Sequence, residues 1–183
     1  AWALVRELPG PAAVVIKHNN PCGAAVAGSL SEAYRKAFEA DPTSAFGGIV
    51  GLNAPVDEAT ARELAKIFLE VVVAPGYSPE ALEVLRQKEA LRLLEIPAAP
   101  EGRQWDVKAL GGGFLVQEAD VVDAAPEEWR VVTRRAPTEA EKQELAFAWK
   151  VVKHVKSNAI VVTKNRVTLG VGAGQMNRVG AAK

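Results

Sequence analysis

The sequence is poor in the residues that build covalent or metal-linked frameworks, with one cysteine and two histidines among 183 residues. The single cysteine, Cys22, excludes an internal disulfide and favours a reducing compartment, so we expect a cytoplasmic protein. One cysteine and two histidines, with neither an H-x-E motif nor paired C-x-x-C motifs, do not supply the zinc site of a hydrolytic deaminase. We therefore expect no zinc and no other structural metal.

Net charge and long apolar runs are also absent. The 22 Lys and Arg residues balance the 22 Asp and Glu residues, so no net field attracts nucleic acid or an anionic membrane. No apolar run approaches the roughly 20 residues of a membrane-spanning helix. The first residues, AWALVREL, lack the basic segment and apolar run of a secretory signal. We expect no nucleic-acid partner and no membrane partner.

What remains is an ordinary globular composition, with 49% hydrophobic and 24% charged residues. A chain of this length can bury one substantial core. It begins without Met and stops soon after the glycine-rich segment GVGAGQ. We therefore interpret residues 1–183 as a fragment of a longer protein.

The first half of the chain alternates predicted strands with predicted helices. We expect strands at 12–17, 47–53, 71–75 and 91–96, and helices at 29–41, 58–70 and 78–90. Side chains that cap helix N-termini precede each helix: Ser29 or Ser31, then Asp57, then Ser78. This alternation predicts an α/β fold, a mostly parallel sheet with helices on its faces.

The second half changes character. Residues 97–137 contain four prolines and a triple glycine, which indicate an irregular region with short strands that can pair antiparallel. Thr138 and Glu141 form a capping box that opens a long helix over 139–156. Two strands, 159–163 and 166–174, follow and are joined by a tight turn.

Polar residues are concentrated directly behind the first strand, in the stretch VVIKHNNPCGAA. We expect Lys17 and His18 at the carboxyl end of a parallel strand, where open α/β sheets bind ligands. Histidine suits proton transfer near neutral pH, and a neighbouring lysine can stabilise a developing anion. The alternative is a His18 bonded to its own loop, with Lys17 in water. The special backbone residues that follow, Asn-Asn-Pro-Cys-Gly, predict a shaped loop.

Two further stretches carry weaker signals. In SAFGG, Gly47 would let a ligand approach the backbone and Phe46 could stack on a ring; the alternative is a tight turn with a core Phe. Glu70 is expected where a helix ends, and its carboxylate could hold ribose hydroxyls or simply be a solvated helix end.

The last candidate set is Ser157-Asn158 together with GVGAGQMNR, residues 170–178. The glycines resemble a phosphate loop, but they follow a strand without the long helix of a dinucleotide fingerprint, so we reject that interpretation. A bulged strand is the alternative. Arg178 offers a planar fork that suits a carboxamide, carboxylate or phosphate. We interpret His154, inside the long helix, as structural.

Taken together, six stretches resemble one family in order along the chain. They are IKHNNPCGAA, AFEADPTSAFGGIVGLN, EVVVAPGYSPEALEVL, GGGFLVQEAD, VKSNAIVVTKN and LGVGAGQMNRV. The sequence is similar to AICAR transformylase, the formyltransferase part of a bifunctional purine-biosynthesis protein that also carries IMP cyclohydrolase. The resemblance covers nearly all of residues 1–183 and is weakest in the proline-rich middle.

The resemblance implies formyl transfer from 10-formyltetrahydrofolate, as co-substrate, to the 5-amino group of AICAR. It also implies a cytidine-deaminase-like α/β fold, a layered sheet with helices on both faces and without the deaminase zinc, in which a monovalent cation can be accommodated.

The same resemblance assigns roles to individual residues. His18 is expected to transfer the amine proton, Lys17 to stabilise the oxyanion, and Asn158 to orient His18 and the carboxamide. The remaining expectations concern substrate contacts: Arg178 on the carboxamide, Phe46 and Gly47 around the imidazole, and Glu70 on the ribose.

Parts of the family pattern are missing from these residues. The cyclohydrolase domain and the later part of the transformylase are absent, and the family's sites lie at a homodimer interface. Two rival hypotheses stay open: a binding module without turnover, and a structural subdomain that needs other parts of the chain. A third, a deaminase-like zinc hydrolase, is disfavoured by the missing zinc ligands.

Overall fold

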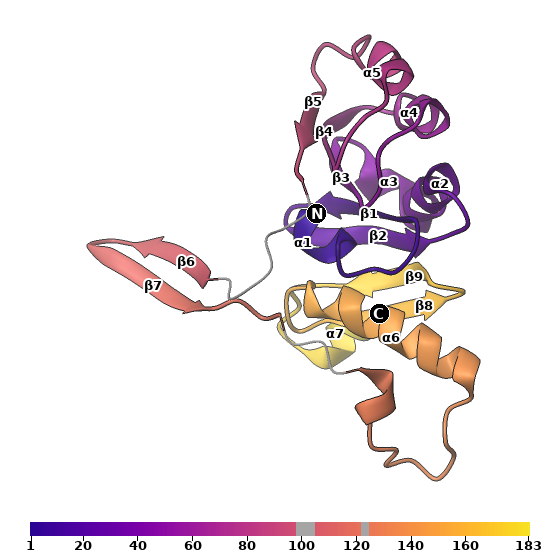
Figure 1. Ribbon diagram of the computed structural model, residues 1–183. Helices are drawn as coiled ribbons and strands as arrows, with labels where there is room; N and C mark the ends of the chain where they lie inside the picture. Colours follow the sequence, from indigo (N-terminus) through magenta and orange to yellow (C-terminus); the bar gives the residue numbers. More distant parts are fainter. Residues whose placement is uncertain (98–104, 122–124) are drawn as a thin grey trace.

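The computed structural model describes residues 1–97, 105–121 and 125–183, and within them a seven-stranded sheet dominates (Figure 1). Its strand order is β5-β4-β3-β1-β2-β9-β8. The strands of this sheet are β1 (Ala12–Lys17), β2 (Asn20–Val26), β3 (Gly48–Leu52), β4 (Leu69–Ala74), β5 (Arg92–Glu95), β8 (Ile160–Lys164) and β9 (Val167–Gly172).

The sheet is mixed, so the prediction of a mostly parallel sheet is wrong. Strands β3, β4 and β5 run parallel, but β1 is antiparallel to both of its neighbours, β2 and β3. The reason is the two-residue turn at His18 and Asn19, which have φ values of 51° and 65°. Two consecutive left-handed residues are typical of a type I′ hairpin turn. The segment Asn20-Pro21-Cys22-Gly23, which we expected to be a loop, is therefore the first part of β2.

The helices begin largely where the sequence predicts. They are α1 (Trp2–Val5), α2 (Leu30–Ala40), α3 (Pro42–Ala45), α4 (Glu58–Leu64), α5 (Pro79–Leu85), α6 (Glu139–Lys153) and α7 (Arg178–Ala182), with a 3₁₀ turn at Pro126–Glu128. Ser29, Asp57 and Ser78 each accept a hydrogen bond from the backbone three residues later, and the capping box at Thr138 is present. These predicted caps are confirmed.

Three helices end several residues earlier than the sequence predicts, and α5 stops at Leu85 instead of residue 90. Helix α4 stops at Leu64 instead of residue 70, so Phe68 lies outside the helix and Glu70 lies within β4. Helix α6 stops at Lys153, and His154 is its C-cap. The His154 Nε2 lies 3.2 Å from Glu7 Oε1, a contact consistent with a structural residue. Burial lowers the pKa of His154, and Glu7 acts in the opposite direction.

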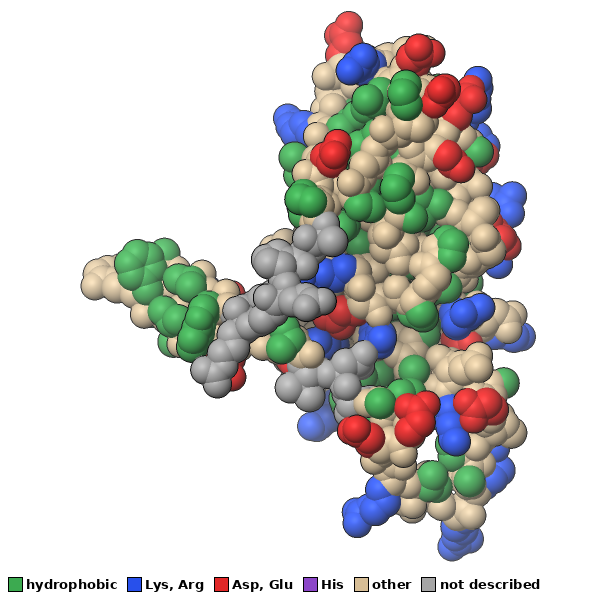
Figure 2. All heavy atoms as spheres, viewed as in Figure 1, with side chains coloured by type: hydrophobic (Ala, Val, Ile, Leu, Met, Phe, Trp, Pro, Cys, Tyr) green, Lys and Arg blue, Asp and Glu red, His purple; other side chains and the backbone are tan. Residues whose placement is uncertain are grey.

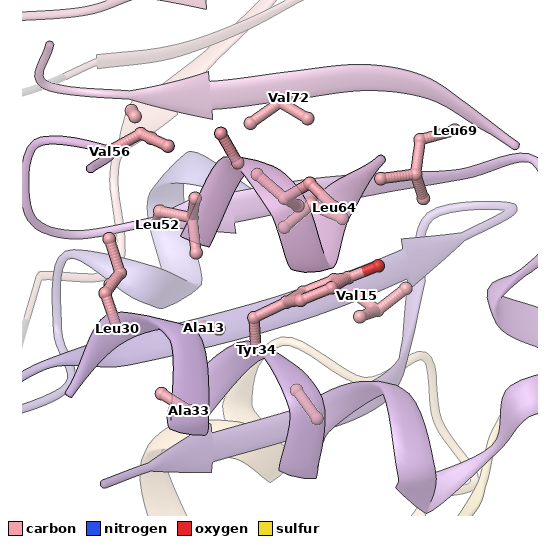
Figure 3. Close-up of a cluster of buried hydrophobic side chains, with 14 of the residues drawn as sticks. Ala13, Val15, Leu30, Ala33, Tyr34, Leu52, Val56, Leu64, Leu69 and Val72 are labelled. Atoms are coloured by element: carbon pink, nitrogen blue, oxygen red, sulfur yellow. The ribbon is translucent and has the colours of Figure 1, made fainter. Parts of the chain in front are cut away.

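The core lies on both faces of the sheet, because β1 is buried on both. Ala13 and Val15 pack into one cluster with α2, α4 and α5, whereas Val14 and Ile16 pack into a second cluster with α1 and α6. Alternate residues of a strand point to opposite faces. Figure 3 shows the first cluster, where the ring of Tyr34 lies among aliphatic side chains from the sheet and the helices. The expected helices on both faces are present.

Two glycines allow helices to lie directly against strands. A Cβ on Gly23 in β2 would overlap the carbonyl oxygen of Ala37 in α2, and a Cβ on Gly172 in β9 would overlap that of Ala181 in α7. Both positions require glycine because the obstruction is backbone, which cannot rotate away. Gly172, in the glycine-rich segment at the end of the chain, therefore has a packing role in addition to any ligand role.

The sheet joins a first half, β1 to β5, to a second half, β8 and β9, through few bonds. Ala25 pairs with Val167, and the backbone N–H of Val26 donates to the carbonyl of Arg166. The buried hydroxyl of Thr168 then accepts from Ala24 N at 2.9 Å and donates to Ala24 O at 3.3 Å. At this position the Thr168 side chain makes the two hydrogen bonds to β2 that a backbone N–H and C=O would make in a regular strand pair.

The remaining described strands, β6 (Trp105–Leu110) and β7 (Gly113–Glu118), form the antiparallel hairpin expected in the middle of the chain. The hairpin projects from the rest of the molecule (Figure 1), and Figure 2 shows hydrophobic side chains along it. Trp105, Val116 and Phe114 are more than half exposed there. Among the described residues, no helix combines the length and the apolar character needed to cross a bilayer.

Candidate active site

The predicted site residues lie on strand ends, or on connections next to them, at one end of the sheet. Strands β1 and β9 finish there, and β2, β3, β4, β5 and β8 begin there. We call this the site end. The candidates at it are Lys17, His18, Phe46, Gly47, Glu70, Asn158 and Arg178. We predicted the carboxyl ends of parallel strands; instead β1 contributes its carboxyl end and the parallel pair β3–β4 its amino ends, because β1 is antiparallel to β3.

Lys17 is held in place by backbone carbonyls. Its Nζ donates to Phe46 O at 2.6 Å and to Gly47 O at 3.2 Å. An ammonium group has three N–H donors, so this arrangement leaves one for a ligand. The alternative in which Lys17 simply points into water is wrong. Two carbonyl dipoles also fix the cation at one location, which electrostatic stabilisation of a developing oxyanion requires.

Phe46 and Gly47 line the approach to this ammonium group. The Phe46 side chain is 62% exposed, so the alternative of a core Phe is wrong. Its ring lies 5.5 Å from the ring of Phe68, at an angle of 47°. Gly47 has φ +65°, and its N–H donates to the carbonyl of Phe68 at 2.8 Å. A side chain at Gly47 would be strained and would crowd Lys17 Nζ, at 3.1 Å from the new Cβ.

Glu70 lies two residues beyond Phe68, at a bulge where β4 pairs with β3. Its carboxylate accepts from Arg92 Nη1 at 2.8 Å, and both side chains are substantially exposed. Exposed ion pairs contribute little stability, about 0–1 kcal/mol, so a ligand hydroxyl can compete for this carboxylate. The interpretation as a solvated helix end is wrong, because Glu70 belongs to a strand.

Asn158 lies in the connection between α6 and β8, which is tied to the segment after β9. Its Nδ2 and its backbone N–H both donate to Gln175 O, at 3.0 and 3.1 Å. The Gln175 N–H donates back to Asn158 O at 3.3 Å, and the peptide bond between Ser157 and Asn158 is cis. The same connection is bonded to the hairpin that carries His18, since Lys156 N donates to Asn20 Oδ1 at 2.9 Å.

Arg178 is exposed at the first position of α7. Asn177 caps this helix through Oδ1, which accepts from Gly180 N at 2.7 Å. Helix α7 begins three residues after Gln175, so the hydrogen bonds between Gln175 and Asn158 also help to fix the position of Arg178. His18 is exposed at the tip of the β1–β2 turn.

A sequence model described as the AICARFT/IMPCHase bienzyme matches residues 1–183. The chain belongs to this bienzyme family. It is 64% identical over 173 residues to the Bifunctional purine biosynthesis protein PurH of Microcystis aeruginosa, covering 94% of this chain and 34% of the relative. It is 62% identical to PurH of Nostoc punctiforme, with the same coverage, and 59% identical to PurH of Cyanothece sp. PCC 7425, covering 100% of this chain and 36% of the relative.

The family assignment confirms the resemblance seen in the sequence motifs. The chain spans about a third of the length of the PurH relatives. Purine biosynthesis is the role that those relatives carry in their name.

In the described ranges, no group of three or more His, Cys, Asp or Glu side chains is placed to hold a metal ion.

Cys22 of the bienzyme chain is poorly suited to act as a nucleophile. Its Sγ donates to Val15 O at 3.4 Å. Burial, followed by the nearby charge of Asp41, raises the pKa of the Cys22 thiol to about 11. The thiolate, which is the reactive form, is therefore scarce at neutral pH.

Alkylation of Cys22 tests this environment. At pH 8 we expect iodoacetamide to react roughly 10²-fold more slowly than with the urea-unfolded chain, because a free thiol has a pKa of about 8.5. Because the folded pKa is raised, the rate should climb about tenfold per pH unit from pH 7 to pH 10 without levelling off. Mass spectrometry of the modified chain measures both rates. A plateau near pH 8.5 in the folded chain would contradict the buried thiol.

Sequence reasoning missed two residues at the site end, Phe68 and Asn20. Phe68 falls inside the helix predicted over residues 58–70, but it lies outside the observed helix and packs against Phe46. Asn20 was seen only as part of a polar run, whereas its side chain binds Lys156, which is 136 residues later. No local pattern signals such a distant contact. The predicted end of the preceding helix at residue 70, rather than at Leu64, concealed Phe68.

Proposed function

We propose that this chain carries the amine-activating part of AICAR transformylase, which transfers a formyl group from 10-formyltetrahydrofolate to the 5-amino group of AICAR. The products are FAICAR and tetrahydrofolate. The observation that supports this most strongly is the convergence at one end of the sheet of Lys17, His18 and Asn158 in a chain of the bienzyme family.

The chemistry explains why these residue types are needed. The amine of AICAR is a poor nucleophile, since its lone pair is delocalised into the ring and the carboxamide. In this proposal Asn158 and Arg178 hold the carboxamide, and His18 accepts the amine proton as the nitrogen attacks the formyl carbon. The remaining N–H of Lys17 donates to the oxyanion that forms on that carbon. Collapse of the tetrahedral intermediate breaks the bond from the formyl carbon to N10 of the folate, which takes up the proton from His18 and leaves as tetrahydrofolate.

Substrate binding extends along the same end of the sheet. Phe46 and Gly47 form a wall beside the imidazole ring of AICAR. The ring of Phe68 packs against that of Phe46, and the Phe68 carbonyl accepts from Gly47 N–H. Glu70 binds the ribose by exchanging its exposed partner, Arg92, for sugar hydroxyls. This assigns the exposed aromatic ring and the strand bulge a common purpose.

The proposal includes four further properties that the family resemblance implies. They are a cytidine-deaminase-like arrangement of the layers, a homodimer, a cytoplasmic location and a bound monovalent cation. The mixed sheet with helices on both faces supports the first of them.

A second candidate function is a nucleotide-binding or structural part that needs the rest of the bienzyme for turnover. The observation that favours it is length, because residues 1–183 correspond to about a third of the PurH relatives. Under this alternative AICAR still binds, but no formyl transfer is measured with this chain alone.

Calorimetric titration with AICAR tests the proposed site. We expect saturable binding to the folded chain and a loss of roughly tenfold or more in affinity for Arg178→Ala, because hydrogen bonds to charged groups contribute about 1.5–3 kcal/mol. Arg166→Ala is the matched control, since Arg166 lies in the turn between β8 and β9 at the opposite end of the sheet. If both variants lower the AICAR affinity equally, or if Arg178→Ala leaves it unchanged, Arg178 does not bind AICAR and its assignment is wrong.

A further inference from the structure

We propose that Asn20 is a positioning residue that keeps the two halves of the catalytic set in register. The inference rests on the proposed function, because it concerns how His18 and Asn158 are brought to bear on one substrate. These two residues belong to different halves of the sheet, and Asn20 bonds one half to the other at the site end.

The first part of the evidence is the rigidity of the hairpin tip. Lys17 and Asn20 are paired residues that flank the two-residue turn of His18 and Asn19. A type I′ turn has a narrow range of backbone angles, so Asn20 follows any movement of His18 closely. Pro21, directly behind Asn20, is buried and its φ is fixed by its ring.

The second part is a continuous series of hydrogen bonds that starts at Asn20. Its Oδ1 accepts from Lys156 N at 2.9 Å, and Lys156 O accepts from Gly174 N at 2.7 Å. Asn158 and Gln175 then exchange three further bonds. The series ends at the segment that leads into α7 and Arg178. Asn20 is thus bonded directly to the loop that carries Asn158, and indirectly to the helix that carries Arg178.

The third part is the small number of bonds that otherwise join β2 to β9. The strands share one paired position, Ala25 with Val167, and the bonds of Thr168 to Ala24 lie in the middle of the joint. The strand joint is therefore fixed mainly near its middle and its far end, while α6 is held to the first half by bonds from Lys150, Lys153 and His154 to Glu7. The bond from Asn20 to Lys156 adds a direct restraint between the His18 turn and the connection that carries Asn158.

The catalytic consequence follows from the geometry of proton transfer. A base must lie within hydrogen-bond distance of the proton that it removes, and a misplacement of about 1 Å can cost ~10²-fold in rate. We therefore expect loss of the Asn20 bond to lower kcat much more than it lowers stability.

The test uses this 183-residue chain grafted in place of the matching segment of PurH from Microcystis aeruginosa. In that chimera we expect Asn20→Ala to lower kcat for formyl transfer at least tenfold, towards the ~10²-fold limit of a misplaced group. We expect KM for AICAR to change less than kcat. Asn20→Asp, which keeps an acceptor oxygen for Lys156 N, should restore most of the lost kcat.

Asn53→Ala is the control for general destabilisation. The Asn53 side chain makes three hydrogen bonds, to Ala12 N, Leu8 O and Gly10 O, at the opposite end of the sheet. We expect it to lower the urea midpoint more than Asn20→Ala does, with kcat per folded molecule unchanged. If the two variants lower kcat equally, Asn20 acts through stability and the proposal is overturned.

Nuclear magnetic resonance on the 183-residue chain separates this proposal from the proposed function. In Asn20→Ala we expect the contacts between the His18 turn and residues 156–158 to weaken, while contacts within β3 and β4 persist. An inactive wild-type chimera would count against formyl transfer, yet this spectrum would still report on positioning. Unchanged contacts across the joint in Asn20→Ala would overturn the role of Asn20 whatever the activity.

Discussion

Replacing His18 by Ala is expected to lower kcat for formyl transfer by ~10²–10⁴-fold, the range typical of a lost general acid-base group. AICAR affinity should change little, because the His18 side chain is exposed at a turn and the proposal assigns binding to Arg178, Asn158 and Glu70. The two measurements are steady-state kinetics in the PurH chimera and calorimetric titration with AICAR. Together they distinguish a proton-transfer residue from a binding residue.

The neighbouring turn residue provides the control. Asn19 has φ 65°, which glycine adopts without strain, so Asn19→Gly should preserve both the turn and the activity. If His18→Ala keeps wild-type kcat, the proton leaves by another route and the assignment of His18 fails. If His18→Ala abolishes AICAR binding while Asn19→Gly does not, His18 is a binding residue and the binding-module hypothesis gains.

The local elements of the fold could be predicted because their signals are local. Ser29, Asp57, Ser78 and the Thr138 box each begin a helix within a few residues of the capping side chain. The orientation of the strands could not be predicted, because it depends on the hairpin between β1 and β2. His18-Asn19 lacks the glycine that usually marks a type I′ turn, so the reversal of the chain after β1 was hidden in the sequence.

The candidate site likewise has a part that the sequence predicts and a part that only the structure gives. Lys17 and His18 are adjacent in sequence, so their proximity needed no structure. Their relation to Asn158 depends on β2 pairing with β9 across 140 or so residues, which no periodicity reveals. The resemblance to the transformylase family supplied that relation before the fold was known. The structure adds the physical connection, namely the bond from Asn20 to Lys156.

Replacing Gly23 by Ala is expected to cost about 3 kcal/mol of folding free energy, at the upper end of the range for overpacked sites. The new Cβ would overlap the carbonyl oxygen of Ala37 and lie 2.8 Å from its carbonyl carbon. Since both atoms are backbone, α2 and β2 must separate, and the buried contacts between them weaken. Urea denaturation followed by circular dichroism measures the loss. Gly111→Ala, with no atom within 4 Å of the new Cβ, is the matched control.

The same substitution links the core to the site. Gly23 lies three residues after Asn20 on β2, so a displaced β2 carries the His18 turn away from the connection that bears Asn158. We therefore expect the folded fraction of the Gly23→Ala chimera to lose kcat as well, whereas Asn53→Ala loses only stability. A Gly23→Ala chain as stable as Gly111→Ala would show that α2 can shift without cost, and the close packing of α2 on β2 would then not be what fixes the hairpin at the site end.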